Sequence, residues 1–484
     1  MRKYIQIISF LLAAVTLSGC ENWLDVKPET EVNEDDMFNT EQGFMDALYG
    51  IYVNMGKSDL YGGTLQTALD MTAQYYSYYD ISECPYGHYQ TFEYEHPSCT
   101  AISDALWMRI YYCIGLTNNL LKYLDKPEAV QICSNYDYLR GEALALRAYL
   151  HFELIRIFAP DVKKNPEYKS IPYRKTFSPD IEPQLKVKEV YQEILADLTE
   201  AKQLLSNDVI RTNGPDWLGE SEKKEESDDV TDKNEGYYTS DFLKTRKYRM
   251  NYYAVKALQA RAFLWYGEKE NAYAAAMEVI EAKNSDGSKK FDIEAIKTAF
   301  PGQDFIIYPE QIFGLYDHQL DDKYSSFFQT GILYKGTSSQ EIMKNLYGNT
   351  GKDFREQYLW ELQRLVDGDR YTIKKYNVTL GVKQIPLIRL SELYFIAIES
   401  GSAEQAQKLW DEYRDSRVLD RKDLPTDPKQ LQQEILTEFR KEFYAEGQLF
   451  YLYKRYNSPR EDILFANSRL VVNYILPLPK TELK

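Results

Sequence analysis

Tyrosine dominates the residues of this chain that could recognise another molecule. The sequence contains 42 Tyr beside 21 Phe and 6 Trp, so that aromatic residues make up 14% of it. A tyrosine ring stacks on an apolar surface while its hydroxyl forms hydrogen bonds. Residues 75–79 are all tyrosines except Ser77, and a helix or strand would bury only one side of such a run. We therefore expect some of these rings to face outward.

Residues for catalysis or metal binding show no recognisable spacing. The chain has only 4 His, and its 5 Cys match no zinc motif. A glycoside hydrolase would need two facing carboxylates about 5 to 10 Å apart, and no motif pairs the many Asp and Glu residues in this way. Arg389, Glu392 and the charged residues of 438–446 alternate with apolar positions, which predicts structural ion pairs. We expect no enzyme activity and no cofactor, and the sequence leaves open whether a calcium ion assists.

The composition describes a globular, acidic protein. Of the 484 residues, 44% are hydrophobic, and the net charge is −16. Nucleic-acid binding draws on Lys and Arg that displace counterions, and no basic block interleaved with aromatic residues occurs, so nucleic acid is not an expected partner. No flexible linker divides the chain, and we expect one domain over residues 41–484, with a charged surface excursion at 206–240.

Hydrophobic periodicity predicts a mainly helical scaffold that must position the tyrosines. Apolar residues recur at helical spacing from Thr40, a plausible N-cap, and over 102–123, 136–158, 187–205, 252–282, 388–417 and 428–456. Alternating patterns predict short strands in 305–315, 371–376 and 471–478. Residues 260–280 and 393–410 pair small residues with bulky ones around a glycine, as in tetratricopeptide-like hairpins; generic helical hairpins remain an alternative. Four tryptophans on helical faces are expected in the core: Trp107, Trp265, Trp360 and Trp410.

The first twenty residues predict export. Arg2 and Lys3 precede an uncharged run at 4–17, which is too short for a membrane span of about 20 apolar residues and is typical of a secretory signal. The tetrapeptide 17–20 resembles a bacterial lipobox, which implies a signal peptide at 1–19 and lipid attachment at Cys20. An ordinary signal peptide is the alternative. Residues 20–40 then form a lipidated tether, with several acyl chains holding the protein on a membrane.

The four remaining cysteines could form disulfides in an exported protein. Three pairings are possible for Cys84, Cys99, Cys113 and Cys133. We favour a bridge between Cys84 and Cys99, because both flank a loop-like stretch with prolines and a glycine. Cys113 lies in a helical pattern, where it would be a buried free thiol.

The order of several motifs resembles the SusD/RagB-like lipoproteins of Bacteroidetes across nearly the whole mature chain. The matching segments are 20–28, 105–119, 142–158, 385–394, 438–447 and 474–482. The charged insertion at 206–240 departs from the family pattern. The resemblance implies a lipid-anchored protein on the surface of the outer membrane that binds a nutrient glycan. It also implies a SusC-like TonB-dependent transporter as partner, on which the protein acts as a hinged lid, and no catalysis.

The resemblance also places the ligand surface in loops early in the chain and between the middle helices. A sugar ring offers an apolar face and hydroxyl groups, which suits tyrosine. The expected stacking platforms are Tyr76, Tyr78, Tyr79 and Tyr86, with Asp80, His88 and Gln90 as partners for sugar hydroxyls. A second region contributes Tyr324 and Phe327, and Trp217 in the charged excursion is a third candidate. The alternative is that these rings form a packing layer in the core.

Three other functions remain open from the sequence. Part of the family resembles peptide importers of the RagB type, so a peptide or glycopeptide is an alternative ligand. A surface glycoside hydrolase is the alternative from another class. A lipoprotein that packs on the transporter without a ligand is the third.

Overall fold

A computed structural model describes residues 34–77, 84, 86–212, 242–244, 246–329, 333–335, 340–366, 368–377 and 383–483. The predicted signal peptide and the lipidation site Cys20 lie outside these residues. So do Tyr78, Tyr79, Asp80 and Trp217, and most of the charged excursion at 206–240. In the part of the chain that the structure describes, no helix is long and apolar enough to cross a bilayer.

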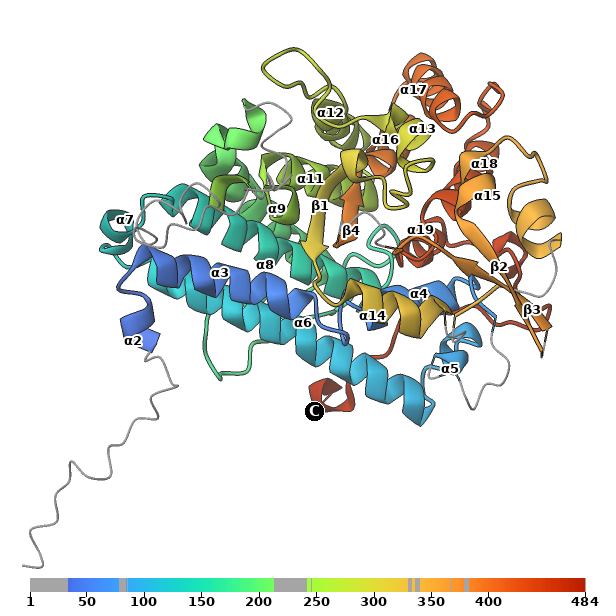
Figure 1. Cartoon of the computed structure of the whole chain (residues 1–484). Helices are drawn as coiled ribbons and strands as arrows, with labels where there is room; N and C mark the ends of the chain where they lie inside the picture. The colour runs from blue at the N-terminus through green and yellow to red at the C-terminus, as the bar shows by residue number, and fades with distance from the viewer. Residues whose placement is uncertain are drawn as a thin grey trace, which may run out of the picture.

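Four long helices form the N-terminal half. They are α3 (Glu41–Met55), α6 (Pro97–Leu124), α8 (Tyr136–Phe158) and α9 (Val187–Leu204). Helices α3 and α6 both pack near α8, and α9 packs along α8 as well (Figure 1). Every residue of α8 from Gly141 to Phe158 is buried, which makes α8 the central helix. It ends at Phe158 because Ala159 precedes Pro160 and has extended backbone angles.

Helical hairpins follow, as the periodicity predicted. Helix α11 (Tyr252–Tyr266) turns into α12 (Lys269–Ile280) at Gly267, whose φ of 89° is in the left-handed region that favours glycine. Helix α16 (Leu390–Ser400) is joined to α17 (Ala403–Ser416) through Ser402, which forms a capping box with Gln405. The two hairpins pack through α12 and α16 (Figure 1). Helices α18 (Pro428–Glu442) and α19 (Leu449–Tyr456) complete the C-terminal part.

Four short strands form two antiparallel pairs. Strand β1 (Gln311–Tyr316) pairs with β4 (Gln384–Arg389), and β2 (Trp360–Leu365) pairs with β3 (Gly368–Ile373). The prediction of a strand at 471–478 was wrong: that stretch is irregular, although Leu476 N donates to Ile157 O of α8. The start of the helix predicted at 388–417 was also wrong, because β4 extends to Arg389 and α16 begins at the next residue.

Shorter elements connect these parts. The short α-helices are α2 (Glu34–Met37), α4 (Thr64–Thr72), α5 (Gly87–Gln90), α7 (Ala129–Ile132), α13 (Ile296–Ala299), α14 (Leu320–Tyr324) and α15 (Phe354–Tyr358). The 3-10 turns are Leu205–Asn207, Val209–Arg211, Arg246–Tyr248, Ile293–Ala295, Tyr308–Glu310, Arg460–Asp462 and Lys480–Leu483, and the π turns are Ser325–Gln329 and Gln340–Leu346.

Buried apolar side chains from Phe38 to Leu476 form a single cluster. It contains the four tryptophans expected in the core, Trp107, Trp265, Trp360 and Trp410, which expose 3%, 5%, 8% and 0% of their surface. The mainly helical scaffold with hairpins and a few short strands is therefore confirmed.

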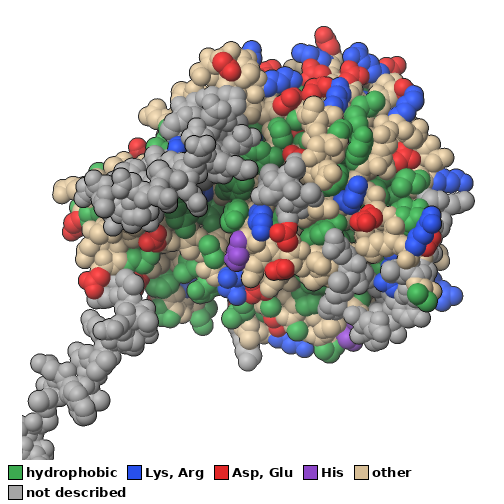
Figure 2. Space-filling view, viewed as in Figure 1, with side chains coloured by type: hydrophobic (Ala, Val, Ile, Leu, Met, Phe, Trp, Pro, Cys, Tyr) green, Lys and Arg blue, Asp and Glu red, His purple; other side chains and the backbone are tan. Residues whose placement is uncertain are grey.

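On the face shown in Figure 2, Lys and Arg side chains are interspersed with Asp and Glu and do not gather into one basic patch. This distribution fits the acidic net charge of −16, and that face offers no stripe of positive charge for a phosphate backbone.

Candidate functional site

Tyr75 and Tyr76, the two tyrosines after α4 that the structure describes, are both buried. Tyr75 and Tyr76 each expose 2% of their surface. The Tyr75 hydroxyl donates to Arg440 O at 2.7 Å, and its ring lies 3.8 Å from that of Tyr444. Adjacent rings can both be buried here because this segment has C-terminal residues on one side and the residues after α14 on the other. Tyr76 is therefore not the exposed platform that we predicted.

Two further candidate rings, Tyr86 and Tyr324, are buried as well, with 8% and 4% exposure. Neither presents an open face for stacking, so the prediction of exposed rings was wrong for both. Phe327 differs from them, because it is partly buried at the edge of the core cluster. Among the candidate rings within the described ranges, Phe327 alone is partly exposed.

The two predicted ligand regions nevertheless meet in space. The centroid of the Phe328 ring lies 6.0 Å from that of Tyr76 and 5.9 Å from that of Tyr324. Ser77 N donates to Tyr334 O at 2.7 Å, which links the backbones of the two regions. These two segments, far apart in the sequence, are therefore neighbours in the structure, although most of their candidate rings are buried.

Between these segments lies a small pocket, which we call the aromatic pocket. Three predicted residues line it, namely Tyr76, Tyr324 and Phe327. Asp70 of α4 and Lys323 of α14 also line it, although neither was predicted from the sequence. Asp70 could have been suspected, because it is the one charged residue of α4.

The polar groups of the aromatic pocket are incompletely hydrogen-bonded. Asp70 is fully buried, and its Oδ1 accepts from Gly447 N at 3.0 Å, whereas its Oδ2 has no hydrogen-bond partner. The Tyr76 hydroxyl has no partner either. Burial raises the pKa of the Asp70 carboxyl well above its usual value, although Lys375 opposes this shift. The protonated carboxyl and the phenol could both donate hydrogen bonds to hydroxyl oxygens of a ligand.

Glycines bring α14 close to the start of α4. A Cβ atom on Gly63 would lie 2.7 Å from Ser58 O and 3.3 Å from Cζ of Phe327. Lys323 Nζ donates to Gly56 O at 3.0 Å and also pairs with Asp317. Phe327 and Lys323 are therefore positioned against a backbone that has little room for a side chain.

The remaining described candidates, His88 and Gln90, lie on α5 beside this region. Gln90 Nε2 donates to Tyr76 O at 2.8 Å, which fixes α5 against the tyrosine segment. The His88 ring stacks on that of His96 at 3.5 Å, and its Nδ1 lies 2.6 Å from Glu93 Oε2. Both side chains are partly exposed, so they are accessible as predicted, but each already has protein partners.

The expected disulfide between Cys84 and Cys99 is not formed. Both are free and buried, as are Cys113 and Cys133. Cys99 lies in the first turn of α6, within the core and beneath Tyr89, whose hydroxyl donates to Cys99 O at 3.2 Å. Burial raises the pKa of the Cys99 thiol to about 12, which leaves it protonated and unreactive.

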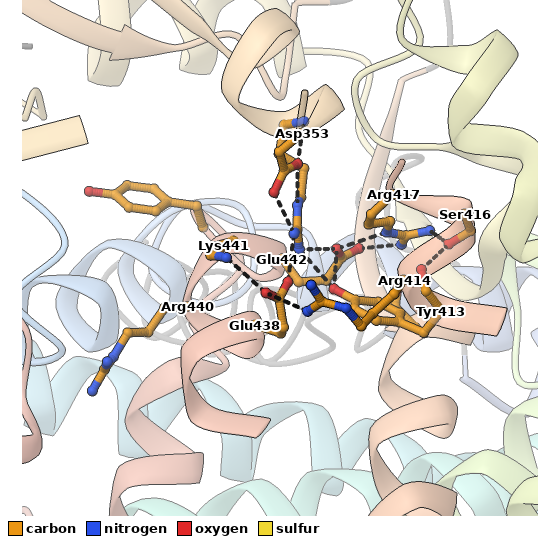
Figure 3. A network of polar contacts seen from close by, with 12 residues as sticks. Asp353, Tyr413, Arg414, Ser416, Arg417, Glu438, Arg440, Lys441 and Glu442 are labelled. Atoms are coloured by element: carbon orange, nitrogen blue, oxygen red, sulfur yellow. Dashed lines mark hydrogen bonds and ion pairs between the residues drawn. The ribbon is translucent and has the colours of Figure 1, made fainter. Parts of the chain in front are cut away.

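The charged residues of the C-terminal motifs form a buried network, which Figure 3 shows in part. Glu442 Oε1 lies 2.7 Å from Arg417 Nη2 and 2.9 Å from Arg389 Nη1, and Glu442 Oε2 lies 3.0 Å from Arg355 Nη1. Burial alone would raise the pKa of Glu442, but the three guanidinium groups hold it well below its usual value. These four side chains are buried, and the arginines also pair with the carboxylates of Asp353, Glu438, Glu310 and Glu446. This confirms the prediction of structural ion pairs.

Glu446 and Glu392 of the same sequence motifs also form buried ion pairs with arginines. Arg389 Nη2 lies 2.9 Å from Glu446 Oε1, and Glu392 accepts two hydrogen bonds from Arg261 at 2.6 and 2.5 Å. Within the described ranges, no group of three His, Cys, Asp or Glu side chains has an arrangement that could hold a metal ion.

The N-terminal part of the chain is similar to a known protein family. Residues 22–214 match the SusD-like family model described as starch-binding and associating with the outer membrane. A SusD superfamily protein from Bacteroides thetaiotaomicron has a TM-score of 0.66 and 20% identity, over 92% of this chain and 97% of that one. A Bacteroides fragilis member has a TM-score of 0.64 and 19% identity, over 93% and 98%.

A laminarin-binding SusD-like protein is similar to this chain as well. Its TM-score is 0.63 and its identity 18%, over 92% of this chain and 98% of that one. No curated protein sequence matches. The solved structures therefore establish the fold over nearly the whole chain.

Proposed function

We propose that this chain is a SusD-like protein that captures a nutrient glycan at the bacterial surface and passes it to a SusC-like transporter. The family description supports binding of carbohydrate at the outer membrane. The binding region that we propose is the aromatic pocket with the surface around it, from α5 to Phe327.

One observation carries this proposal: the two tyrosine- and phenylalanine-rich segments, far apart in sequence, meet at the aromatic pocket. There the partly exposed Phe327 ring lies in the same pocket as Asp70 and Tyr76, whose Oδ2 atom and hydroxyl group, respectively, have no hydrogen-bond partner. An apolar ring beside hydrogen-bond donors is the combination that a sugar needs, because it offers both an apolar face and hydroxyl groups.

A ligand screen on the purified mature chain tests the proposal. We expect saturable binding of at least one polysaccharide or oligosaccharide and none of a matched set of peptides. Binding of peptides alone would favour the RagB-type function, and release of reducing ends from a polysaccharide would show an enzyme. Repeating the titration with calcium and with a chelator tests whether a metal contributes; we expect equal affinities.

The anchor and the partner need separate experiments. We propose that Cys20 carries the lipid, so a Cys20→Ala variant should leave the outer-membrane fraction and lose incorporation of labelled fatty acid. We also propose that the protein co-purifies with a TonB-dependent transporter from detergent-solubilised membranes. A chain that is not acylated, or that purifies without such a transporter, would contradict these parts of the proposal.

A further inference from the structure

A second, small cavity lies where α8, α11, α16, α18 and α19 meet. It shares no lining residue with the aromatic pocket. Trp265 of α11 and Tyr451 of α19 contribute aromatic walls. We call this space the arginine cavity, because its charged lining is dominated by guanidinium groups.

The lining of the arginine cavity has an excess of positive charge. Arg156, Arg261 and Arg455 all line it, against the single carboxylate of Glu392. Arg261 is bonded to Glu392 along one edge. Arg455 is bonded to Glu399, with a distance of 2.7 Å from Nη2 to Oε2, but Glu399 does not line the cavity.

Arg156 is the least satisfied of the three arginines. It exposes only 2% of its surface, and its guanidinium carbon lies 3.7 Å from the centroid of the Tyr451 ring. It pairs with Glu153, one turn earlier on α8, whereas its Nε has no hydrogen-bond partner. A buried guanidinium N–H without an acceptor is unfavourable, because it has lost its contacts with water.

The electrostatic surroundings of Arg156 also favour a bound anion. Burial lowers the pKa of Arg156, and the positive charge of Arg261 lowers it further, although Tyr451 acts in the opposite sense. A bound anion would reverse this effect, since it would supply both an acceptor for Nε and a compensating negative charge. Guanidinium groups bind the oxygens of carboxylates and of phosphate-like ions particularly well.

We propose that the arginine cavity binds a small oxyanion, which accepts a hydrogen bond from Arg156 Nε and lies in the field of Arg261. The helices around it come from both halves of the chain, α8 from the first and α11, α16, α18 and α19 from the second. The anion therefore links the two halves and stabilises the fold. This role is independent of glycan binding at the aromatic pocket.

Thermal unfolding tests the proposal. Tm is measured with millimolar sulfate, phosphate or acetate, and each value is compared with that in chloride at the same ionic strength. We expect at least one oxyanion to raise Tm saturably, by about 2 to 3 °C at roughly a hundredfold excess over its Kd. Isothermal titration with the same salt should give one site per chain. Equal Tm values in oxyanion and chloride, with no heat of binding, would overturn the proposal.

Variants locate the site. Arg156→Met and Arg156→Lys both remove the Nε donor, and we expect both to lose the oxyanion-dependent rise in Tm. The matched control is Arg147→Met on the same helix: Arg147 is also buried and is bonded to Asp197, but it does not line the cavity. This control should keep the rise, and an unchanged response in both Arg156 variants would contradict the assignment.

A crystallographic experiment needs no variant and covers the case in which the Arg156 variants fail to fold. In crystals of the wild-type chain soaked in selenate, anomalous scattering should show selenium beside Arg156 Nε. A water molecule alone in that position would overturn the proposal.

Discussion

Glu442 gives the sharpest prediction about stability. Its carboxylate contacts three buried guanidinium groups, those of Arg355, Arg389 and Arg417, and it also accepts from the Tyr413 hydroxyl at 3.1 Å. Glu442→Gln keeps the size of the side chain but removes its negative charge. The three arginines would then keep four other carboxylates, those of Asp353, Glu438, Glu310 and Glu446. Because Lys375 and Lys441 share two of these, the network would lose a negative charge that its cations need.

Removing one partner of a buried ion pair costs about 3 to 5 kcal/mol, because an uncompensated charge remains inside the protein. We therefore expect Glu442→Gln to lower the free energy of unfolding by about 3 to 5 kcal/mol near neutral pH. The control is Glu434→Gln. This change breaks an ion pair with the largely exposed Lys422, whose Nζ lies 2.6 Å from Glu434 Oε2. An exposed pair contributes about 0 to 1 kcal/mol.

Urea unfolding followed by circular dichroism measures both variants. Because the arginines hold the pKa of Glu442 well below its usual value, its contribution is complete above the unfolded pKa of about 4.3 and is lost as the pH falls through the folded value. The difference between wild type and Glu442→Gln should therefore shrink on acidification. A loss no larger than that of Glu434→Gln would refute the view that this network holds the C-terminal part together.

Two further predictions concern Asp70 and the cysteines. Burial raises the pKa of Asp70, so the wild-type protein loses stability as the pH rises above the unfolded pKa of about 3.9 towards the folded pKa. Asp70→Asn cannot ionise and should therefore gain stability relative to wild type between about pH 4 and about pH 7. Parallel pH profiles of the two proteins in urea unfolding would contradict this. Cys84, Cys99, Cys113 and Cys133 are free, so a reducing agent should leave Tm unchanged. Alkylation of the unfolded chain without reductant should label all four cysteines. A disulfide-linked Cys84–Cys99 peptide in the mass spectrum would show the reasoning to be wrong.

The helices were predictable because their signals are local. The stretch predicted at 136–158 is α8 (Tyr136–Phe158), and Thr40 caps α3 by accepting from Gly43 N at 3.2 Å. The boundary at β4 was not predictable from local signals. Its residues form an apolar run continuous with α16, and they become a strand because β1, far earlier in the chain, supplies hydrogen bonds.

The orientation of the tyrosines depends on packing that a sequence pattern does not reveal. Tyr75 and Tyr76 are neighbours, and a single packing surface could have buried only one of them. Both are buried because Tyr444 packs against both rings and Phe328 packs against Tyr76. The disulfide prediction failed for a similar reason: the prolines and glycine suggested a loop, whereas Cys99 belongs to the first turn of α6.

Glycan affinity tests the central claim most directly. It is measured for the wild type, Phe327→Ala and Phe177→Ala with the glycan found in the ligand screen. Phe327 lines the aromatic pocket, whereas Phe177 is 51% exposed beside Lys122, close to the C-terminal end of α6. Loss of a stacking ring should weaken binding about tenfold or more in Phe327→Ala and leave Phe177→Ala at the wild-type affinity. Equal affinities in all three proteins, with both variants folded, would contradict the proposal that the aromatic pocket binds the glycan.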